Sequence, residues 1–291
     1  MRFVELVRFA SSAIVAHPMR SVLTSLGVVI GVAAVVMMTS IGLGAQQRVA
    51  ASISSLGSNL IIVTPNWQRA GGGVSQGQGT GVTLTDSDAE AIAKQIEGVA
   101  AVAPQVRGQA QLIADGANWN SRIEGVTPDY LVARDLTIVS GRMFDEREAR
   151  QGRKVLIVGQ TVARELWPDA DPIGRRVRVR SVPFEVIGVL GSKGQSAFGQ
   201  DQDDVVIAPL EAVRSRITGR RSRGDTVQQI YIKAESGDSL DDVQEDVTNL
   251  LRELHRIRPG ADDDFMTQNM ASILEASQAT IKTFTILLSA V

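Results

Sequence analysis

The sequence predicts an α+β protein in which one N-terminal transmembrane helix is followed by a split βαβ domain with an inserted β-rich subdomain. Three observations lead to this prediction. A long apolar run without charge lies near the N-terminus, and two strand–helix–strand patterns lie far apart in the chain. Between these two patterns, short β-branched runs alternate with turn residues.

The apolar run extends from Ser21 to Gln47 without a charged side chain. A helix that crosses the bilayer needs roughly 20 mostly apolar residues, whereas the apolar core of a signal peptide has about 7–15 and precedes a small-residue cleavage site. Gly42–Ala45 is only a loose imitation of such a site. We therefore expect a retained transmembrane helix at 21–47; a cleaved signal peptide is the alternative.

Small residues along this helix have a spacing that favours helix packing in lipid. Gly27 and Gly31 are four residues apart, and Ser40 and Gly44 repeat the interval. Small residues at this interval let a second helix approach closely. These four residues are the candidate functional positions, as a membrane-helix packing surface; the alternative is chance in a chain with 27 glycines.

Basic residues predict the orientation of the helix. Arg2, Arg8 and Arg20 precede the apolar run, and only Arg48 follows it closely. The positive-inside bias places the N-terminus in the cytoplasm and the remainder outside. Apolar residues at helical spacing in segment 1–20 predict an amphipathic helix in contact with the membrane lipid at the cytoplasmic interface. A short helix packed on protein is the alternative.

Composition excludes several classes of protein. The chain has 291 residues, a net charge of −2 and no cysteine. This charge balance argues against a general nucleic-acid binder. The absence of cysteine excludes disulfides and thiolate chemistry.

The first strand–helix–strand pattern begins with the apolar run 58–65, which ends at a proline. A glycine-rich segment at 66–81 reads as a loop. Thr85 then caps a helix, and Asp88 completes a capping box. The following strand contains Pro104, which predicts an edge strand. The expected buried face of the helix consists of Ala89, Ile92, Ala93 and Ile96.

The second pattern begins with the alternating run 228–235. A helix follows, with Ser239 as its cap and Asp242 three residues later, and 263–270 supplies a last short strand. The expected buried face of this helix consists of Leu240, Val243, Val247, Leu250 and Leu254. Two such halves separated by a long insert predict a split βαβ domain of the ferredoxin-like kind.

The insert itself reads as β-rich. Residues 155–160 form a buried-strand pattern, and Thr161 is expected to cap a short helix. In the run 175–180, Arg176, Arg178 and Arg180 are expected on one face of a strand that is paired with the returning strand 184–190. The arginine stripe is interpreted as a solvated sheet face, with a grip for an acidic partner as the alternative.

No motif for an enzyme is present. The sequence lacks the metalloprotease, nucleophile-elbow and phosphate-loop patterns. The two histidines are His17, beside the apolar run, and His255, at the end of a helix where a cation suits the helix dipole. Two acidic clusters lack the alternating oxygen spacing of a calcium loop and are interpreted as solvated turns: Asp201, Asp203 and Asp204, and Asp262, Asp263 and Asp264. We therefore expect no catalytic, cofactor-binding or metal-binding residues.

A series of motifs in fixed order nevertheless resembles a known family. The series consists of MRSVLTSLGVVIG, LGSNLIIV, GVTPDY, SGRMF, VLIVGQTVARELWPDADPIGRRVRV, FEVIGVL, DDVVIAPL and LLRELHRIRPGADDDF. In this order they resemble ABC-transporter permeases of the macrolide-exporter (MacB-like) type over nearly the whole chain.

The resemblance implies a permease subunit of the bacterial inner membrane that couples ATP hydrolysis to motion of its periplasmic domain and thereby exports substrate. Because no Walker motif is present, ATP would be bound by a separate cytoplasmic ATPase, and this chain would hold no cofactor. The further implied partners are a second permease copy, in a homodimer or heterodimer, and a periplasmic adaptor. The expected domains are an interfacial segment at 1–20, the transmembrane helix at 21–47, a porter-like half at 48–114, the β-rich subdomain at 115–225, the second porter-like half at 226–275 and the start of a second membrane helix at 276–291.

Two other functions compete with export. A relative of the family would use ATP-driven motion to control cell-wall enzymes or to release lipoproteins. A single-span anchored module would bind or sense a ligand outside the cell. The final apolar run has about nine residues, about half of what crosses a bilayer, so the resemblance implies a truncated second membrane helix.

Overall fold

The computed structural model describes residues 18–56, 59–66, 84–196, 200–218, 224–237 and 239–269, together with residues 272, 279, 280 and 283. The predicted interfacial helix before Pro18 therefore lies outside the described residues, as does the glycine-rich loop after Asn66. Of the predicted second membrane helix at 276–291, only residues 279, 280 and 283 are described. The chain divides into two units, which are described separately. One contains the N-terminal helix up to Ala50, and the other is the body, Ala51–Leu274, which includes the last six residues of that helix.

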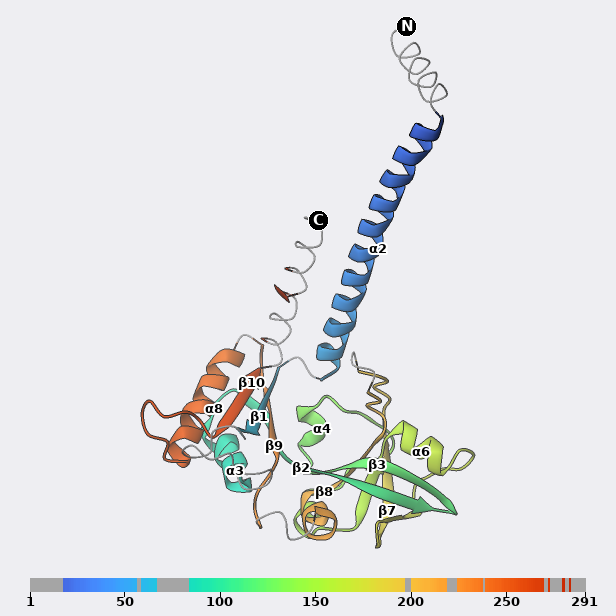
Figure 1. Cartoon of the computed structure of the whole chain (residues 1–291). Helices are drawn as coiled ribbons and strands as arrows, with labels where there is room; N and C mark the ends of the chain where they lie inside the picture. Colours follow the sequence, from blue (N-terminus) through green and yellow to red (C-terminus); the bar gives the residue numbers. More distant parts are fainter. Residues whose placement is uncertain are drawn as a thin grey trace, which may run out of the picture. The chain divides into compact units, whose positions relative to one another are not determined.

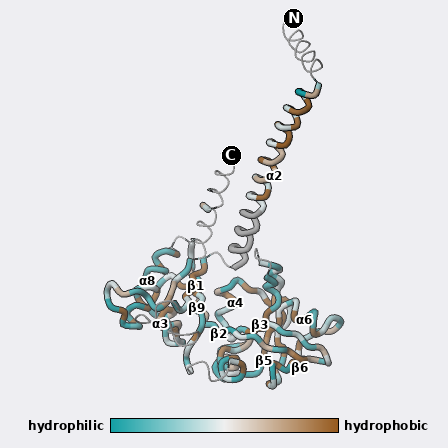
Figure 2. The backbone as a smooth tube through the Cα atoms, in the orientation of Figure 1, coloured by the Kyte–Doolittle hydropathy of each residue, from teal (hydrophilic) through white to brown (hydrophobic). Residues whose placement is uncertain are grey.

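The N-terminal helix α2 spans Pro18–Leu56 and is longer than the predicted segment at both ends (Figure 1). Its Pro18–Gly42 part is long and apolar enough to cross a membrane. Much of this part is coloured brown, for hydrophobic residues, in Figure 2. Val28, Val29 and Ile30 point to different sides of the helix, and each is at least 60% exposed. A helix that is apolar on every side requires an apolar surrounding.

The split βαβ domain is confirmed. Its first half consists of β1 (Leu60–Pro65), α3 (Asp86–Gln95) and β2 (Val99–Ala114), and its second half of β9 (Gln229–Ala234), α8 (Leu240–Leu254) and β10 (Phe265–Asn269). The four strands lie in the order β10-β1-β9-β2, and all neighbours are antiparallel. This order interleaves the two halves, because each strand–helix–strand unit leaves a gap that a strand of the other unit fills.

The insert extends the same sheet. Its elements are β3 (Ala117–Val126), α4 (Tyr130–Ala133), β4 (Ile138–Gly141), α5 (Glu146–Arg150), β5 (Val155–Val158), α6 (Gln160–Leu166), β6 (Arg176–Val179), β7 (Val182–Leu190), β8 (Val205–Pro209), α7 (Leu210–Val213) and the π-helix η1 (Arg214–Thr218). Beyond β2 the order continues as β3-β8-β5-β7-β4, and β6 pairs with β2 and β7. The β3–β8 and β5–β7 pairs are parallel, so the insert is a mixed sheet with short crossover helices.

Strand β2 belongs to both parts of the body. Its residues Val99–Gln105 pair with β9, and Gln105–Ala114 pair with β3. Pro104 lies where β2 has β9 on one side and the pairing with β3 has not yet begun. Strand β2 as a whole is therefore central, and only the part around Pro104 has an unpaired side. The missing N–H of Pro104 falls on this unpaired side.

The sheet has an apolar layer on each face. Because neighbouring strand residues point to opposite faces, Ile61 and Ile232 lie in the core beneath α3 and α8. Leu60 and Tyr231 lie in the core on the α4 side. Short insert helices complete both layers.

The caps and buried faces of α3 and α8 test the sequence patterns. The capping box of Thr85 and Asp88 is confirmed. Ser239 occupies the predicted cap position, but its side chain makes no capping bond and contacts Ser236 instead. Ala93 is exposed, contrary to prediction.

On α8 the buried face is rotated from the predicted one. Leu251 is fully buried, whereas Leu250 is half-buried and Leu254 is 42% exposed. Both Leu250 and Leu251 lie three or four residues after Val247, so helical spacing fits either one. Only the position of the sheet decides which of them is buried.

Two predictions in the insert are wrong. The cap of α6 is Gly159, and Thr161 instead donates to the carboxylate of Asp201 at 2.7 Å. Arg176 and Arg178 do form an exposed stripe on β6. Arg180 lies in the turn with a φ of 55° and donates to the carbonyl of Ile217 at 2.8 Å, because the tight reversal between β6 and β7 ends the alternation.

Candidate functional site

The four predicted packing positions lie on α2. Nothing else in the described chain lies within 4 Å of a Cβ built at Gly27, Gly31 or Gly44, and Ser40 is exposed. At about 100° per residue, the Gly27/Gly31 pair and the Ser40/Gly44 pair point about 140° apart around the helix. The four residues therefore form two small-residue faces, and their role in packing remains a prediction.

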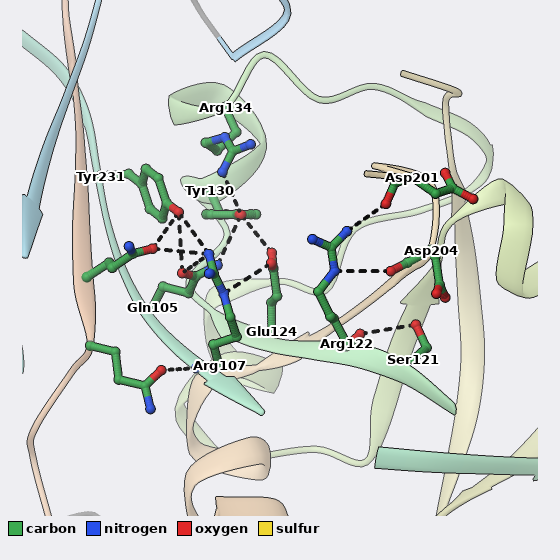
Figure 3. Close-up of polar contacts among 12 residues, drawn as sticks. Gln105, Arg107, Ser121, Arg122, Glu124, Tyr130, Arg134, Asp201, Asp204 and Tyr231 are labelled. Carbon is green, nitrogen blue, oxygen red and sulfur yellow. Dashed lines mark hydrogen bonds and ion pairs between the residues drawn. The ribbon is translucent and has the colours of Figure 1, made fainter. Parts of the chain in front are cut away.

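A buried polar network joins the split βαβ domain to the insert (Figure 3). The tyrosine network, as it is called below, consists of Gln105 and Arg107 from β2, Glu124 from β3, Tyr130 and Arg134 from α4 and its end, and Gln229 and Tyr231 from β9. The Tyr130 hydroxyl donates to Glu124 Oε2 at 2.7 Å and accepts from Gln105 Nε2 at 3.2 Å. The Tyr130 and Tyr231 rings meet edge to face, with centroids 5.5 Å apart.

Two arginines neutralise and cover this network. Arg107 Nε lies 3.7 Å from Glu124 Oε1, and the Arg134 guanidinium lies 5.0 Å from the centroid of the Tyr231 ring. Burial and the nearby Glu124 carboxylate hold the pKa of Tyr130 well above its ordinary value. Because this hydroxyl does not ionise at neutral pH, it keeps donating to Glu124 and holds α4 against β3. The network is thus suited to holding two parts of the body together.

A second connection between the same parts runs through Arg214, at the start of η1. Its guanidinium donates to both carboxylate oxygens of Asp86 and to Glu211, each at 2.7 Å. Arg214 is only 6% exposed. Because Asp86 is the first residue of α3 and Glu211 lies in α7, one buried cation ties the first half of the split domain to the insert.

A third polar group, the histidine cluster, consists of Asp88, His255 and Asp264. Nδ1 of His255 lies 2.8 Å from Asp264 Oδ1, and Nε2 lies 3.4 Å from Asp88 Oδ2. The bond to Asp88 and the ion pair with Asp264 raise the pKa of His255 to about 9. The imidazole is therefore positively charged at neutral pH and links α3 to the end of α8.

The acidic clusters have protein partners, and all of their residues but the exposed Asp262 are buried or half-buried, so their interpretation as solvated turns is wrong for those five residues. Trp119 Nε1 donates to the Asp204 carboxylate at 2.9 Å, and the backbone N–H of Lys193 donates to Asp203 at 2.7 Å. Arg122 donates to the carbonyl oxygens of Asp201 and Asp204 (Figure 3). Asp263 pairs with Arg252. These carboxylates hold loops in place.

A cavity of about 330 Å³ opens between α3, α5 and α7 and is called the acidic cavity below. Its buried apolar lining consists of Ala89, Val102, Pro104, Val126, Ala149 and Leu210. Its more exposed lining contains the carboxylates of Asp86, Glu90, Asp129, Glu146 and Glu211 and the guanidinium of Arg150. The volume lies at the lower end of the usual range for small-molecule sites, about 300–1,000 Å³.

Sequence reasoning missed the tyrosine network and the acidic cavity. One signal for the network was present, since Glu124 interrupts the apolar end of β3 beside Ile123 and Val126. A buried carboxylate requires partners. No local pattern identifies those partners, which lie on β2, α4 and β9.

Comparison with known proteins gives the family. A model of the MacB-like periplasmic core domain matches residues 21–250. The chain belongs to this family. The resemblance found on the sequence motifs is thereby confirmed, and the match extends from the first turn of α2 through the insert and into α8.

Curated MacB relatives extend over nearly all of the chain. The "Macrolide export ATP-binding/permease protein MacB" of Rhodospirillum rubrum is 39% identical over 291 residues, which cover 99% of this chain and 42% of that protein. The protein of the same name from Chlorobium luteolum is 36% identical over 290 residues, covering 100% of this chain and 43% of that protein. The chain thus spans less than half the length of these MacB proteins.

Solved structures confirm the α+β fold. The periplasmic region of MacB from Actinobacillus actinomycetemcomitans matches with a TM-score of 0.61 and 22% identity, covering 78% of this chain and 95% of that one. The extracellular domain of the noncanonic ABC-type transporter YknZ from Gram-positive bacteria matches with a TM-score of 0.56 and 18% identity, covering 72% and 100%.

Proposed function

We propose that this chain is the membrane-anchored, extracytoplasmic part of an ABC-transporter permease, with its N-terminus in the cytoplasm of a bacterium and its body outside the inner membrane. One observation carries the proposal. A helix whose first 25 residues are apolar enough to span a bilayer continues unbroken to Leu56, shortly before β1 of a MacB-like body begins at Leu60. An uninterrupted helix joins the part that would lie in lipid to the part that would work outside.

In this proposal a separate cytoplasmic ATPase binds and hydrolyses ATP, and α2 transmits the resulting motion. Bending a helix sharply breaks its backbone hydrogen bonds, so an unbroken helix passes on a tilt instead of absorbing it. The tyrosine network and Arg214 then keep the two parts of the body together while it moves. Substrate is acted on outside the membrane, and the name of the relatives makes macrolides the first cargo to test.

The two small-residue faces of α2 fit two helix neighbours. In lipid, close approach at small residues favours association. One face would contact a second permease copy, in a homodimer or heterodimer, and the other a further membrane helix. A periplasmic adaptor would bind the body.

The orientation can be measured with single cysteines, because the natural chain has none. Ser140→Cys lies on exposed β4 of the body, and Ser12→Cys precedes α2. We expect a membrane-impermeant maleimide to label only Ser140→Cys in intact spheroplasts and both variants after lysis. Labelling of Ser12→Cys alone in intact spheroplasts would show that the orientation is opposite to the proposed one. Mature protein that lacks its N-terminus would instead indicate a cleaved signal peptide.

The transmission step is tested by adding flexibility to α2. Two glycines inserted between Ala50 and Ala51, within the helix, should abolish export and uncouple ATP hydrolysis without loss of assembly. Deletion of residues 71–81, in the predicted glycine-rich loop, is the matched control and should leave both unchanged. The readout is the drug resistance of cells that express each permease variant together with its ATPase. Normal export with the glycine insertion would contradict the lever, and lost export in the deletion would contradict the linker interpretation of the loop.

A further inference from the structure

We propose that the acidic cavity binds a small hydrophobic organic cation, an amine with an apolar body. This inference rests on the proposed function in one respect, since such a molecule would be the cargo of the permease. The site itself lies wholly within the body of one chain.

The apolar part of the lining would bind the apolar body of the ligand. Ala89 and Val102 are 4% and 7% exposed, and Val126 is fully buried, yet all three border the opening between α3 and α5. Small side chains on α3 leave the space that a larger side chain would fill. A ligand that covered this surface would gain free energy from the apolar area it removes from water.

The charged part of the lining favours a ligand with a positive charge. Of the five carboxylates, Asp86 and Glu211 share the single positive charge of Arg214, so this group keeps one net negative charge. Two of the others have exposed partners on their own helices, Glu90 with Lys94 at 3.1 Å and Glu146 with Arg150 at 4.0 Å. Such exposed pairs contribute little and exchange readily. The cavity therefore keeps an excess of negative charge.

Asp129 has no such partner. Although it stands at the N-cap position of α4, its side chain makes no capping bond, and no ion pair joins it to the described residues. Partial burial raises the pKa of the Asp129 carboxyl above its ordinary value. The Asp129 side chain belongs to the exposed part of the lining, where an ammonium group of a ligand would form an ion pair with it.

A neighbouring hydroxyl supports the same position. Thr127 also lines the acidic cavity, and its Oγ1 is buried without a hydrogen-bond partner among the described residues. Buried hydroxyls without partners are uncommon, because each loses its bonds to water. Rotation about the Cα–Cβ bond would let Thr127 bind a polar group of a ligand held at Asp129.

The position of the cavity links binding to motion. Residues of α3 come from the first half of the split domain, and residues of α5 and α7 come from the insert. A shift between these elements would change the volume of the cavity and, with it, the affinity for the cation. A site with this construction could release its ligand when the body is moved.

The test measures binding by the full chain in lipid nanodiscs. Dansylcadaverine is the probe, because it joins an apolar fluorophore to a protonated primary amine, and its N-acetyl form is the matched neutral compound. We expect saturable binding of the amine and at least tenfold weaker binding of the acetylated form, after subtraction of the signal from empty nanodiscs. Equal binding of the two compounds would overturn the assignment of a cation site.

Two variants test whether the probe binds in the acidic cavity. Asp129→Asn removes the unpaired charge without removing a capping bond and should weaken binding three- to fivefold, whereas Glu97→Gln, an exposed carboxylate outside the lining, should not. Ala93→Phe fills the opening from an exposed position of α3 and should abolish binding. Wild-type affinity in both Asp129→Asn and Ala93→Phe would overturn the proposal. Because the assay needs no ATPase, a failure here leaves the glycine-insertion test of export unaffected.

Discussion

The tyrosine network and the histidine cluster are both buried polar groups, yet they stabilise the body in different ways. The tyrosine network connects the split domain to the insert through a carboxylate, two phenols and two arginines. Burial and the Glu124 carboxylate hold the pKa of Tyr130 well above its ordinary value of about 10, so its hydroxyl stays protonated at neutral pH. The histidine cluster connects elements of the split domain only, through a group with a pKa of about 9. The connection between the two parts is thus independent of pH near neutrality, whereas the connection within one part is not.

The largest expected effect comes from removing the central carboxylate of the tyrosine network. Glu124→Ala leaves the buried Tyr130 hydroxyl without its acceptor and Arg107 without its ion pair. We expect a loss of about 2–3 kcal/mol in the free energy of unfolding, measured by denaturant titration of the full chain in detergent. The exposed Glu97→Ala should change it by less than about 0.5 kcal/mol. Equal effects would mean that the network does not join the two parts.

The histidine cluster should lose its contribution at high pH. The folded-state pKa of His255 lies at about 9, above the unfolded value of about 6.5, so the folded chain binds the extra proton between these values. Its stabilisation is fully present below about pH 6.5 and disappears as the pH rises through about 9. His255→Gln should therefore cost about 2 kcal/mol at pH 6 and much less at pH 10. Melting temperatures of both proteins across this range give the readout, and parallel curves would contradict the assigned pKa.

The capping box of α3 adds a smaller, local contribution to the same cluster. Thr85→Ala removes the acceptor of the Asp88 N–H and one donor to the Asp88 carboxylate. A lost N-cap typically costs about 1 kcal/mol. Ser87→Ala is the control in the same turn, since Ser87 is exposed and, within the part of the chain that the structure describes, its hydroxyl contacts Thr85 alone. Comparable melting temperatures for the two variants would show that the cap is dispensable.

The smallest effect is expected at the second phenol of the tyrosine network, Tyr231. Tyr231→Phe removes the hydroxyl that donates to Gln229 Oε1 at 2.7 Å. Gln229 is half-buried and Arg107 is exposed, so water replaces part of what is lost. A cost of about 0.5–1 kcal/mol is expected, unchanged between pH 6 and pH 9. A pH-dependent cost measured by the same melting curves would place a titrating group in the network and remove the contrast with the histidine cluster.

Local patterns in the sequence predicted the membrane-length helix, the capping box of Thr85 and the strands of the split domain. Each depends on residues a few positions apart, where periodicity and hydrogen-bond geometry act directly. The sequence also predicted the family, because its motifs occur in a fixed order over nearly the whole chain.

Only the tertiary structure decided which residues of these elements face the core and which partners they meet. The buried face of α8 contains Leu251 instead of Leu254 because the sheet lies on that side. Thr161 binds Asp201 instead of capping α6. The tyrosine network and the acidic cavity need residues brought together from distant parts of the chain. No spacing along the sequence encodes such contacts, since they form only when separate strands and helices pack against one another.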